Sequence, residues 1–214
     1  MSAWPELAAR PRALLLDEPL TALDPSTKGV VAHGLASAIA DAGVPTVIVS
    51  HDFAELAQLA SEISVLDRGR IVQHGTAAEL AAAPASALVA DLAGAVVLPG
   101  VAQRAANGLT VIELDGGGEL RSSDAAVGPV AASVYPWEIE LEPAGSEPRG
   151  SALNRLEGEV TAVTEVGGRA RVGLAVPQRL AAEVTTSSAR RLGLRPGARV
   201  VASWKATATR VVAR

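Results

Sequence analysis

The hydrophobic pattern of this chain changes near Gly94, and the change limits the folds that the chain can adopt. Before Gly94, short apolar runs alternate with helical segments, which is typical of a parallel sheet with helices. After Gly94, short alternating strands are separated by glycine-rich turns, which is typical of a small barrel. We therefore expect an α/β segment over residues 1–93 and an all-β barrel region over residues 94–214.

The α/β segment carries local signals for the limits of its elements. Asp24 suits a helix N-cap, Pro25 the first helical position and Gly43 the end of that helix. The first strand contains only apolar residues and is expected to be buried on both faces. The expected strands cover residues 13–16, 46–49, 63–66 and 71–73, and the expected helices cover residues 24–42, 53–61 and 76–82.

The barrel region divides at a loop over residues 143–150, into a portion over residues 95–146 and one over residues 150–213. Residues 109–118 and 160–168 are loosely alike, so the sequence leaves open a degenerate internal repeat that pairs these two segments. The expected strands cover residues 109–114, 130–134, 138–141, 159–164, 170–176 and 199–202.

Composition excludes several classes of protein. The chain of 214 residues has no cysteine, which excludes a disulfide framework, a thiolate metal site and a cysteine nucleophile. The apolar tract over residues 80–100 is interrupted by Pro84 and Asp91, and a membrane span needs about 20 apolar residues. The apolar run at residues 14–16 is too short for a signal peptide, so a cytoplasmic location is expected.

Charge is distributed unevenly along the chain. Residues 150–214 hold 11 Lys and Arg against 4 Asp and Glu, a net charge of +7, although the whole chain has a net charge of −4. This excess of cations indicates either an anionic ligand or a solvated arginine-rich face. Barrels that bind nucleic acid stack bases on aromatic residues, and this segment contains one aromatic residue, Trp204, so we expect no nucleic-acid partner.

Two carboxylates, Asp17 and Glu18, follow the first apolar strand, at the sheet edge where open α/β sheets bind ligands. Asp17 could hold Mg²⁺ and Glu18 could act as a general base on a water molecule, or both could be solvated acids at a strand end. Asp24 lies six residues beyond Glu18, and His51 follows the next apolar strand. Residues at the ends of adjacent strands can converge on one ligand.

Together these motifs resemble the C-terminal half of an ABC-transporter ATPase domain, over residues 7–92. Residues 14–19 resemble its Walker B motif, residues 22–24 its D-loop and residues 50–52 its switch-histidine loop. The resemblance implies that Asp17 is the Mg²⁺-side carboxylate, Glu18 the general base for ATP hydrolysis and His51 a contact to the γ-phosphate. It implies that Asp24 couples two sites across a dimer, although Asp24 could serve only as a helix cap.

The phosphate-binding motifs of that family do not occur in these 214 residues. Neither lysine, Lys28 or Lys205, follows a glycine-rich Walker A loop, and residues 1–10 lack the signature loop expected before Walker B. Lys28 is expected to be a surface charge. We expect that this chain alone neither binds ATP tightly nor hydrolyses it, and that its sheet exposes an apolar face or edge. A start-site error, a true truncation and a split subunit all remain open.

The barrel region resembles the TOBE domain of ABC importers, and its portion over residues 150–213 resembles the molybdate-binding, molbindin-like form of that OB-like barrel. The resemblance implies an oxyanion held by backbone N–H groups, hydroxyls and a lysine. Leu153 stands where the family often has arginine, and Ser187 and Ser188 are expected to cap a helix. The positions that match the anion-binding residues are Ser151, Ala152, Asn154, Lys205, Ala206 and Thr207.

These resemblances imply a peripheral ATP-binding subunit of an oxyanion importer, with molybdate, tungstate or sulfate as the cargo. Its cofactors would be ATP and Mg²⁺, and its partners a membrane permease and a second ATPase subunit or a second copy. The alternative is a non-enzymatic cytoplasmic oxyanion-binding or regulatory protein with a vestigial ATPase segment.

Overall fold

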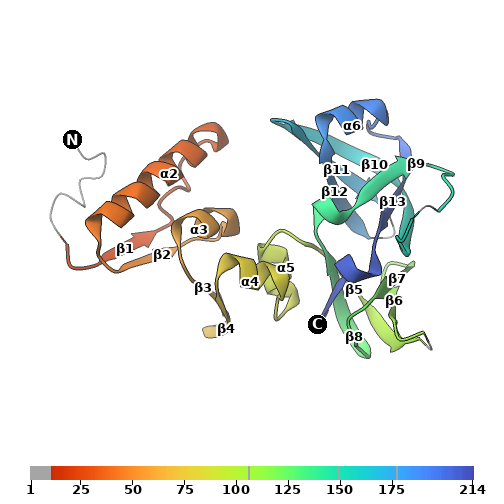
Figure 1. Ribbon diagram of the computed structural model, residues 1–214, viewed down its shortest axis with the longest axis horizontal. Coiled ribbons are helices and arrows are strands. Elements are labelled where there is room, and N and C mark those ends of the chain that lie inside the picture. The colour runs from red at the N-terminus through yellow and green to blue at the C-terminus, as the bar shows by residue number, and fades with distance from the viewer. Residues whose placement is uncertain (1–10, 106, 149, 177) are drawn as a thin grey trace. The chain divides into compact units, whose positions relative to one another are not determined.

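The computed structural model describes residues 11–105, 107–148, 150–176 and 178–214, which group into two compact units divided between Ala82 and Ala83 (Figure 1). This division precedes the expected boundary at residues 93 and 94, because helix α5 (Ala87–Leu92) packs on strand β5 (Val96–Arg104) of the second unit. Residues 1–10, which are expected to contain no signature loop, lie outside the described residues. No described helix is long and apolar enough to cross a membrane.

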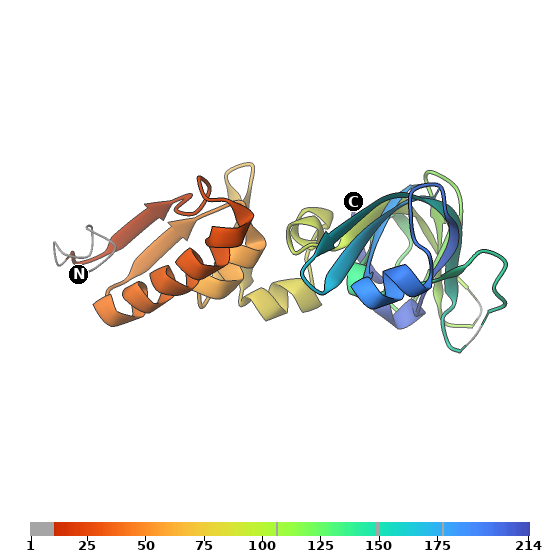
Figure 2. The same ribbon diagram turned by 90° about the horizontal axis from the view of Figure 1, so that it is seen from above.

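The first unit is built on two parallel strands, β1 (Leu14–Asp17) and β2 (Thr46–Val49). Helix α2 (Pro25–Ala42) lies along one face of these strands, as Figure 2 shows. The other face is apolar but uncovered within the described residues, with Leu15 81% exposed and Val47 57% exposed. The expected exposed apolar face is therefore confirmed, and the expectation of burial on both faces is wrong.

Local sequence signals account for the remaining elements of the first unit: α3 (Phe53–Leu59), β3 (Ile63–Asp67), β4 (Arg70–Gly75) and α4 (Ala77–Ala82). The β3–β4 hairpin turns at Arg68 and Gly69, with φ values of 47° and 78°, as the primed two-residue turns of hairpins require. Thr76 and Glu79 form a reciprocal capping box at the start of α4. These elements confirm the expected strand and helix order.

The second unit contains two five-stranded antiparallel sheets. One has the order β12-β11-β10-β13-β9 and the other the order β14-β8-β5-β6-β7. Besides β5, the strands are β6 (Thr110–Leu114), β7 (Glu119–Ser122), β8 (Gly128–Val134), β9 (Glu140–Pro143), β10 (Asn154–Val166), β11 (Arg169–Ala175), β12 (Arg179–Thr185), β13 (Arg199–Trp204) and β14 (Arg210–Ala213). The short helices are η1 (Pro136–Glu138), α6 (Thr186–Arg191) and η2 (Ala206–Ala208).

The two sheets are related halves that exchange their last strands. β5 to β8 in one sheet occupy the same order as β10 to β13 in the other. However, β9 of the first half pairs with β13, and β14 of the second half pairs with β8. A repeat is therefore present, but it matches β5 with β10 and β6 with β11, whereas the repeat that the sequence leaves open matches residues 109–118 with 160–168.

One aliphatic core fills both halves of the barrel, and its largest buried side chain is that of Trp204. This core joins inward-facing residues from both sheets, which confirms the expected all-β barrel after an α/β segment. The strand expected at residues 138–141 begins at Glu140, because Pro136–Glu138 forms a 3-10 turn. Strands β5, β7, β12 and β14 were not expected.

Gly100 in β5 lies against the neighbouring strand, where a Cβ atom would be 2.4 Å from the backbone oxygen of Glu113. We predict that Gly100→Ala lowers the free energy of unfolding by about 1–3 kcal/mol, because the backbone must move apart to admit the methyl group. Urea denaturation followed by tryptophan fluorescence measures this. Gly168→Ala is the control, since nothing lies within 4 Å of its Cβ position. Equal stability of the two variants would contradict the packing of β5 on β6.

Candidate functional site

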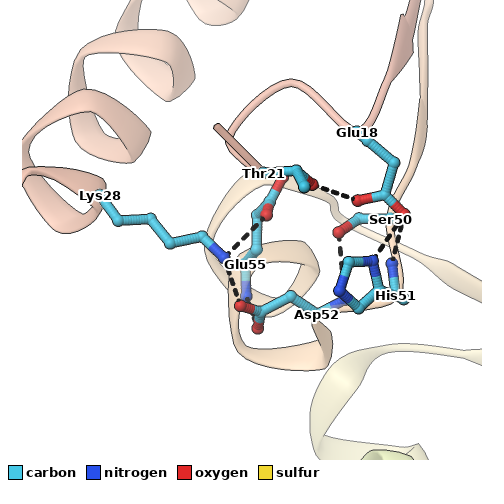
Figure 3. Close-up of polar contacts among 7 residues, drawn as sticks. All are labelled: Glu18, Thr21, Lys28, Ser50, His51, Asp52 and Glu55. Carbon is cyan, nitrogen blue, oxygen red and sulfur yellow. Dashed lines mark hydrogen bonds and ion pairs between the residues drawn. The ribbon is translucent and has the colours of Figure 1, made fainter. Parts of the chain in front are cut away.

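The carboxyl ends of β1 and β2 bring Glu18 and His51 together. Because the strands are parallel neighbours in register, with Asp17 opposite Val49, the residues that follow them meet at one edge. The Glu18 carboxylate lies 2.7 Å from Nδ1 of His51 and accepts a 3.1 Å hydrogen bond from the His51 backbone N–H (Figure 3). Two of the residues expected at a catalytic site are therefore in direct contact.

The backbone of Glu18 is held in an uncommon conformation, with φ of 47°. Its N–H donates to the carbonyl of Val49 at 2.8 Å, and Thr21 Oγ1 donates to its second carboxylate oxygen at 2.7 Å. The hydrogen bonds from His51 and then Thr21 lower the pKa of Glu18, and the hydrogen bond to Glu18 raises the pKa of His51. The pair is thus favoured as carboxylate and imidazolium.

Asp17 and Asp24 are placed differently. The Asp17 side chain is exposed at the end of β1. Asp24 accepts hydrogen bonds from the N–H of Thr27 at 3.1 Å and from its hydroxyl at 2.7 Å, so it caps α2 as the sequence indicates. Among the described residues, no three acidic or histidine side chains converge as a metal site. An exposed carboxylate at a strand end has the chemistry to provide one oxygen ligand to Mg²⁺, an ion that one or two carboxylates usually hold together with substrate phosphates.

Lys28 is a partly exposed charge, as expected, but it is paired with carboxylates rather than solvated alone. Its ammonium lies 2.5 Å from Asp52 and 3.5 Å from Glu55, which is almost fully buried (Figure 3). The hydrogen bond from Lys28 to Asp52 raises the pKa of Lys28 and lowers the pKa of Asp52. Asp52 also caps α3, so Lys28 connects α2 to the loop that carries His51. The 24-residue separation of Lys28 and Asp52 hid this contact from the sequence.

In the second unit, the two segments that resemble an anion-binding site lie at one end of the β10–β13 ladder. Asn154 pairs with Trp204, so residues 151–153 and Lys205 leave the ladder side by side. Ser151, Lys205 and Thr207 are exposed, and Ala206 is buried. Within the described ranges, the side chains of Ser151, Lys205 and Thr207 make no hydrogen bond or ion pair. The two hydroxyls and the ammonium are therefore available to a ligand. Ala152 and exposed Leu153 follow Ser151 and precede β10.

Asn154 is buried, and its side-chain amide is already engaged. Its Oδ1 accepts from the backbone N–H of Arg121 at 2.6 Å, and its Nδ2 donates to the Arg121 carbonyl and to Thr209 Oγ1, both at 2.9 Å. Trp204 Nε1 donates to the same Thr209 hydroxyl. The Asn154 amide thus hydrogen-bonds both the N–H and the C=O of one residue of β7, as the backbone of a neighbouring strand would. At α6, the capping residue is Thr185, which accepts from the N–H of Ser188, rather than Ser187 or Ser188.

We predict that Glu18→Gln lowers the pKa of His51, because the variant loses the carboxylate that stabilises the imidazolium. The charged pair exists only between the lowered pKa of Glu18 and the raised pKa of His51. A pH titration of the histidine ring signals by NMR measures the change. The matched control is Glu62→Gln, whose carboxylate lies beside His74 rather than His51, and which should leave the His51 titration unchanged. An unchanged His51 titration in Glu18→Gln would show that the contact with Glu18 is absent in solution.

We predict that Asn154→Leu lowers the free energy of unfolding by about 2–3 kcal/mol, because the N–H and C=O of Arg121 and the hydroxyl of Thr209 lose a partner in a buried place. Ser151→Ala, three residues away in an exposed turn, should change stability by less than about 0.5 kcal/mol. Urea denaturation of both variants measures the difference. A loss in Asn154→Leu no larger than that in Ser151→Ala would contradict the bridging role.

A family model and several known proteins match parts of this chain. A family model described as the TOBE domain matches residues 150–211. An Fe(3+) ions import ATP-binding protein, FbpC of Pseudomonas fluorescens, is 44% identical over 94 residues, covering 44% of this chain and 27% of the relative. The molybdenum import ATP-binding protein ModC of Rhizobium etli is 33% identical over 211 residues, covering 94% of this chain and 58% of the relative.

A solved structure is similar to part of the chain. It is that of the cytoplasmic molybdate-binding protein ModG with molybdate bound, with a TM-score of 0.50 and 27% identity, covering 56% of this chain and 96% of ModG. The chain covers less than two thirds of the length of the FbpC and ModC relatives. It is nevertheless homologous over most of its own length to ATP-binding subunits of ABC importers, and it carries a TOBE domain.

Proposed function

We propose that the chain serves in the import of a tetrahedral oxyanion such as molybdate, as the Walker B portion and TOBE region of an ABC-importer ATP-binding subunit. The observation that carries the proposal is the contact between Glu18 and His51 at the ends of adjacent parallel strands. In this contact, the Glu18 carboxylate can accept a proton from water, and the His51 imidazolium beside it can face a phosphate. The ModC relative has both parts of this chain in one protein.

In this role, each residue of the first unit has a separate task. Glu18 receives the proton of the attacking water, and His51 holds that carboxylate and presents a positive ring to the γ-phosphate. Asp17 would provide one oxygen ligand to the Mg²⁺ that accompanies the nucleotide, and the chemistry that this ion would supply is neutralisation of charge on the phosphates. Asp24 caps α2 and stands at the loop that would face a second ATPase subunit. A membrane permease would be the further partner, at the cytoplasmic face of the membrane.

The 214 residues contain no glycine-rich loop with a lysine for the β- and γ-phosphates. Most polar contacts that hold ATP in such enzymes come from that loop. We therefore expect Mg·ATP to bind the isolated chain only weakly and to be hydrolysed only when the phosphate-binding loop comes from elsewhere.

The second unit supports the oxyanion class of cargo or effector. A tetrahedral dianion needs several directed donors and a positive charge, and charge-assisted hydrogen bonds are the strong ones. Ser151, Thr207 and Lys205 provide two hydroxyls and an ammonium at one end of the β10–β13 ladder. Asn154 contributes indirectly, because its engaged amide fixes the start of β10 where Ser151 and Ala152 leave the barrel.

The two halves of the barrel differ at this place. The turn at η2 begins with Lys205 and the turn at η1 with Tyr135, and their φ and ψ values agree within 6°: −74° and 147° against −78° and 141°. Tyr135 stacks on exposed Trp137, with ring centroids 4.5 Å apart. An aromatic pair provides no charge for an anion, so a single anion site per chain is expected.

A second candidate function is a non-enzymatic oxyanion-binding or regulatory protein. The free hydroxyls and ammonium of the second unit favour it, because they require nothing from the first unit. The ModG relative, a molybdate-binding protein matched over 96% of its length, supports the same idea. Binding of molybdate without binding of Mg·ATP, even when a phosphate-binding loop is supplied, would favour this second function.

We predict that sodium molybdate binds the full chain with a single site, measured by isothermal titration calorimetry. Lys205→Gln should weaken that binding by about 10- to 100-fold, since a hydrogen bond to a charged group contributes roughly 1.5–3 kcal/mol. The matched control is Arg199→Gln, at the opposite end of β13, which should bind like the unaltered chain. Absence of molybdate binding to the unaltered chain, or equal weakening in both variants, would contradict the oxyanion proposal.

A further inference from the structure

Strand β7 of the first half borders the proposed anion site of the second half. Its residue Arg121 is bonded through both backbone N–H and C=O to the amide of Asn154. Two residues further, the N–H of Ser123 donates to the carbonyl of Ala206 at 3.3 Å. The segment from Arg121 to Ser123 therefore runs from the start of β10 to the turn at η2, past both parts of the site.

Arg121 is the one cation of this segment. Its side chain is 41% exposed and alternates along β7 with the buried residues Leu120 and Ser122. Its guanidinium pairs with Glu119 at 2.9 Å, and the Glu119 side chain is half exposed. An exposed ion pair of this kind contributes little to stability, so the guanidinium can exchange this partner for an anion at small cost.

Of the other two arginines that flank Asn154 and the turn at η2, Arg155 has two firm partners, whereas Arg210 has one longer ion pair of 3.4 Å. Arg155 donates to the Glu142 carboxylate at 3.0 Å and to the carbonyl of Ser146 at 2.7 Å. Arg210 pairs with Asp124, whose other oxygen accepts from the N–H of Val211. A dianion held by Lys205 alone would keep one negative charge uncompensated, and the fork of a guanidinium suits paired oxyanion oxygens.

We propose that Arg121 is the second cation of the oxyanion site, so that the site is composed from both halves of the barrel. The proposal rests on the oxyanion function proposed above and adds a residue outside the segment that matches the TOBE domain. Its structural basis is the Asn154 amide, which holds the backbone of Arg121 beside the segment that carries Ser151. Glu119 is then a competitor that the anion displaces from Arg121.

The experiment is a calorimetric titration of the full chain with sodium molybdate. Arg121→Gln should weaken binding by about 10-fold, because one charge-assisted hydrogen bond is lost. Arg121→Lys should weaken it less, and Glu119→Gln should tighten it, because the competing carboxylate is gone. The hydrogen bonds between Asn154 and residue 121 involve only the backbone of residue 121, so the Arg121 variants retain them. A thermal melting temperature equal to that of the unaltered chain verifies that each variant is folded.

The possible outcomes separate the two proposals. Unchanged affinity in Arg121→Gln, with affinity lost in Lys205→Gln, overturns the role of Arg121 and leaves the oxyanion function standing. No molybdate binding by the unaltered chain overturns both. A loss in Arg121→Gln that is matched by the control Arg199→Gln reports only the reduced net charge and also overturns the role of Arg121.

Discussion

The second unit depends on one buried side-chain amide. Asn154 bonds the backbone of Arg121 in the first half and the hydroxyl of Thr209, which follows the turn at η2. A buried amide with partners adds modest stability, whereas its loss leaves several buried polar groups unpaired. This asymmetry makes Asn154 the residue that fixes how β7, β10 and the turn at η2 lie together. Ser151 and Lys205 obtain their positions from that arrangement.

The exchange of end strands also makes the two halves of the barrel depend on each other. Because β9 completes the sheet of the second half and β14 completes the sheet of the first, neither half has a full sheet from its own residues. Each half therefore completes the sheet of the other, although the TOBE match covers only the second half. The halves have diverged at equivalent turns, with Lys205 in one and the Tyr135–Trp137 stack in the other.

Sequence was sufficient where the signals are local. Asp24 with Pro25, the turn at Arg68 and Gly69, and the apolar run of β2 predicted their elements closely. It was insufficient for β5, whose interior contains Pro99 and Gly100, because the glycine is needed for a close approach to β6 that only the fold reveals. The roles of Lys28 and Asn154 were also hidden, since their partners lie 24 and 33 or more residues away. For the site residues themselves, the sequence placed Glu18 with His51 and residues 151–154 with 205–207, and ligand binding at either place remains a prediction.

The end of the barrel with Lys205 is proposed to bind an oxyanion, and locating a heavy tetrahedral anion in a crystal tests this binding directly. Crystals of the full chain grown with tungstate, with diffraction recorded at the tungsten absorption edge, would show the anion as an anomalous peak. We predict one peak per chain, within hydrogen-bonding distance of Lys205 Nζ and of the turn at Ser151. A peak elsewhere, such as beside His51, or no peak at saturating tungstate, would contradict it.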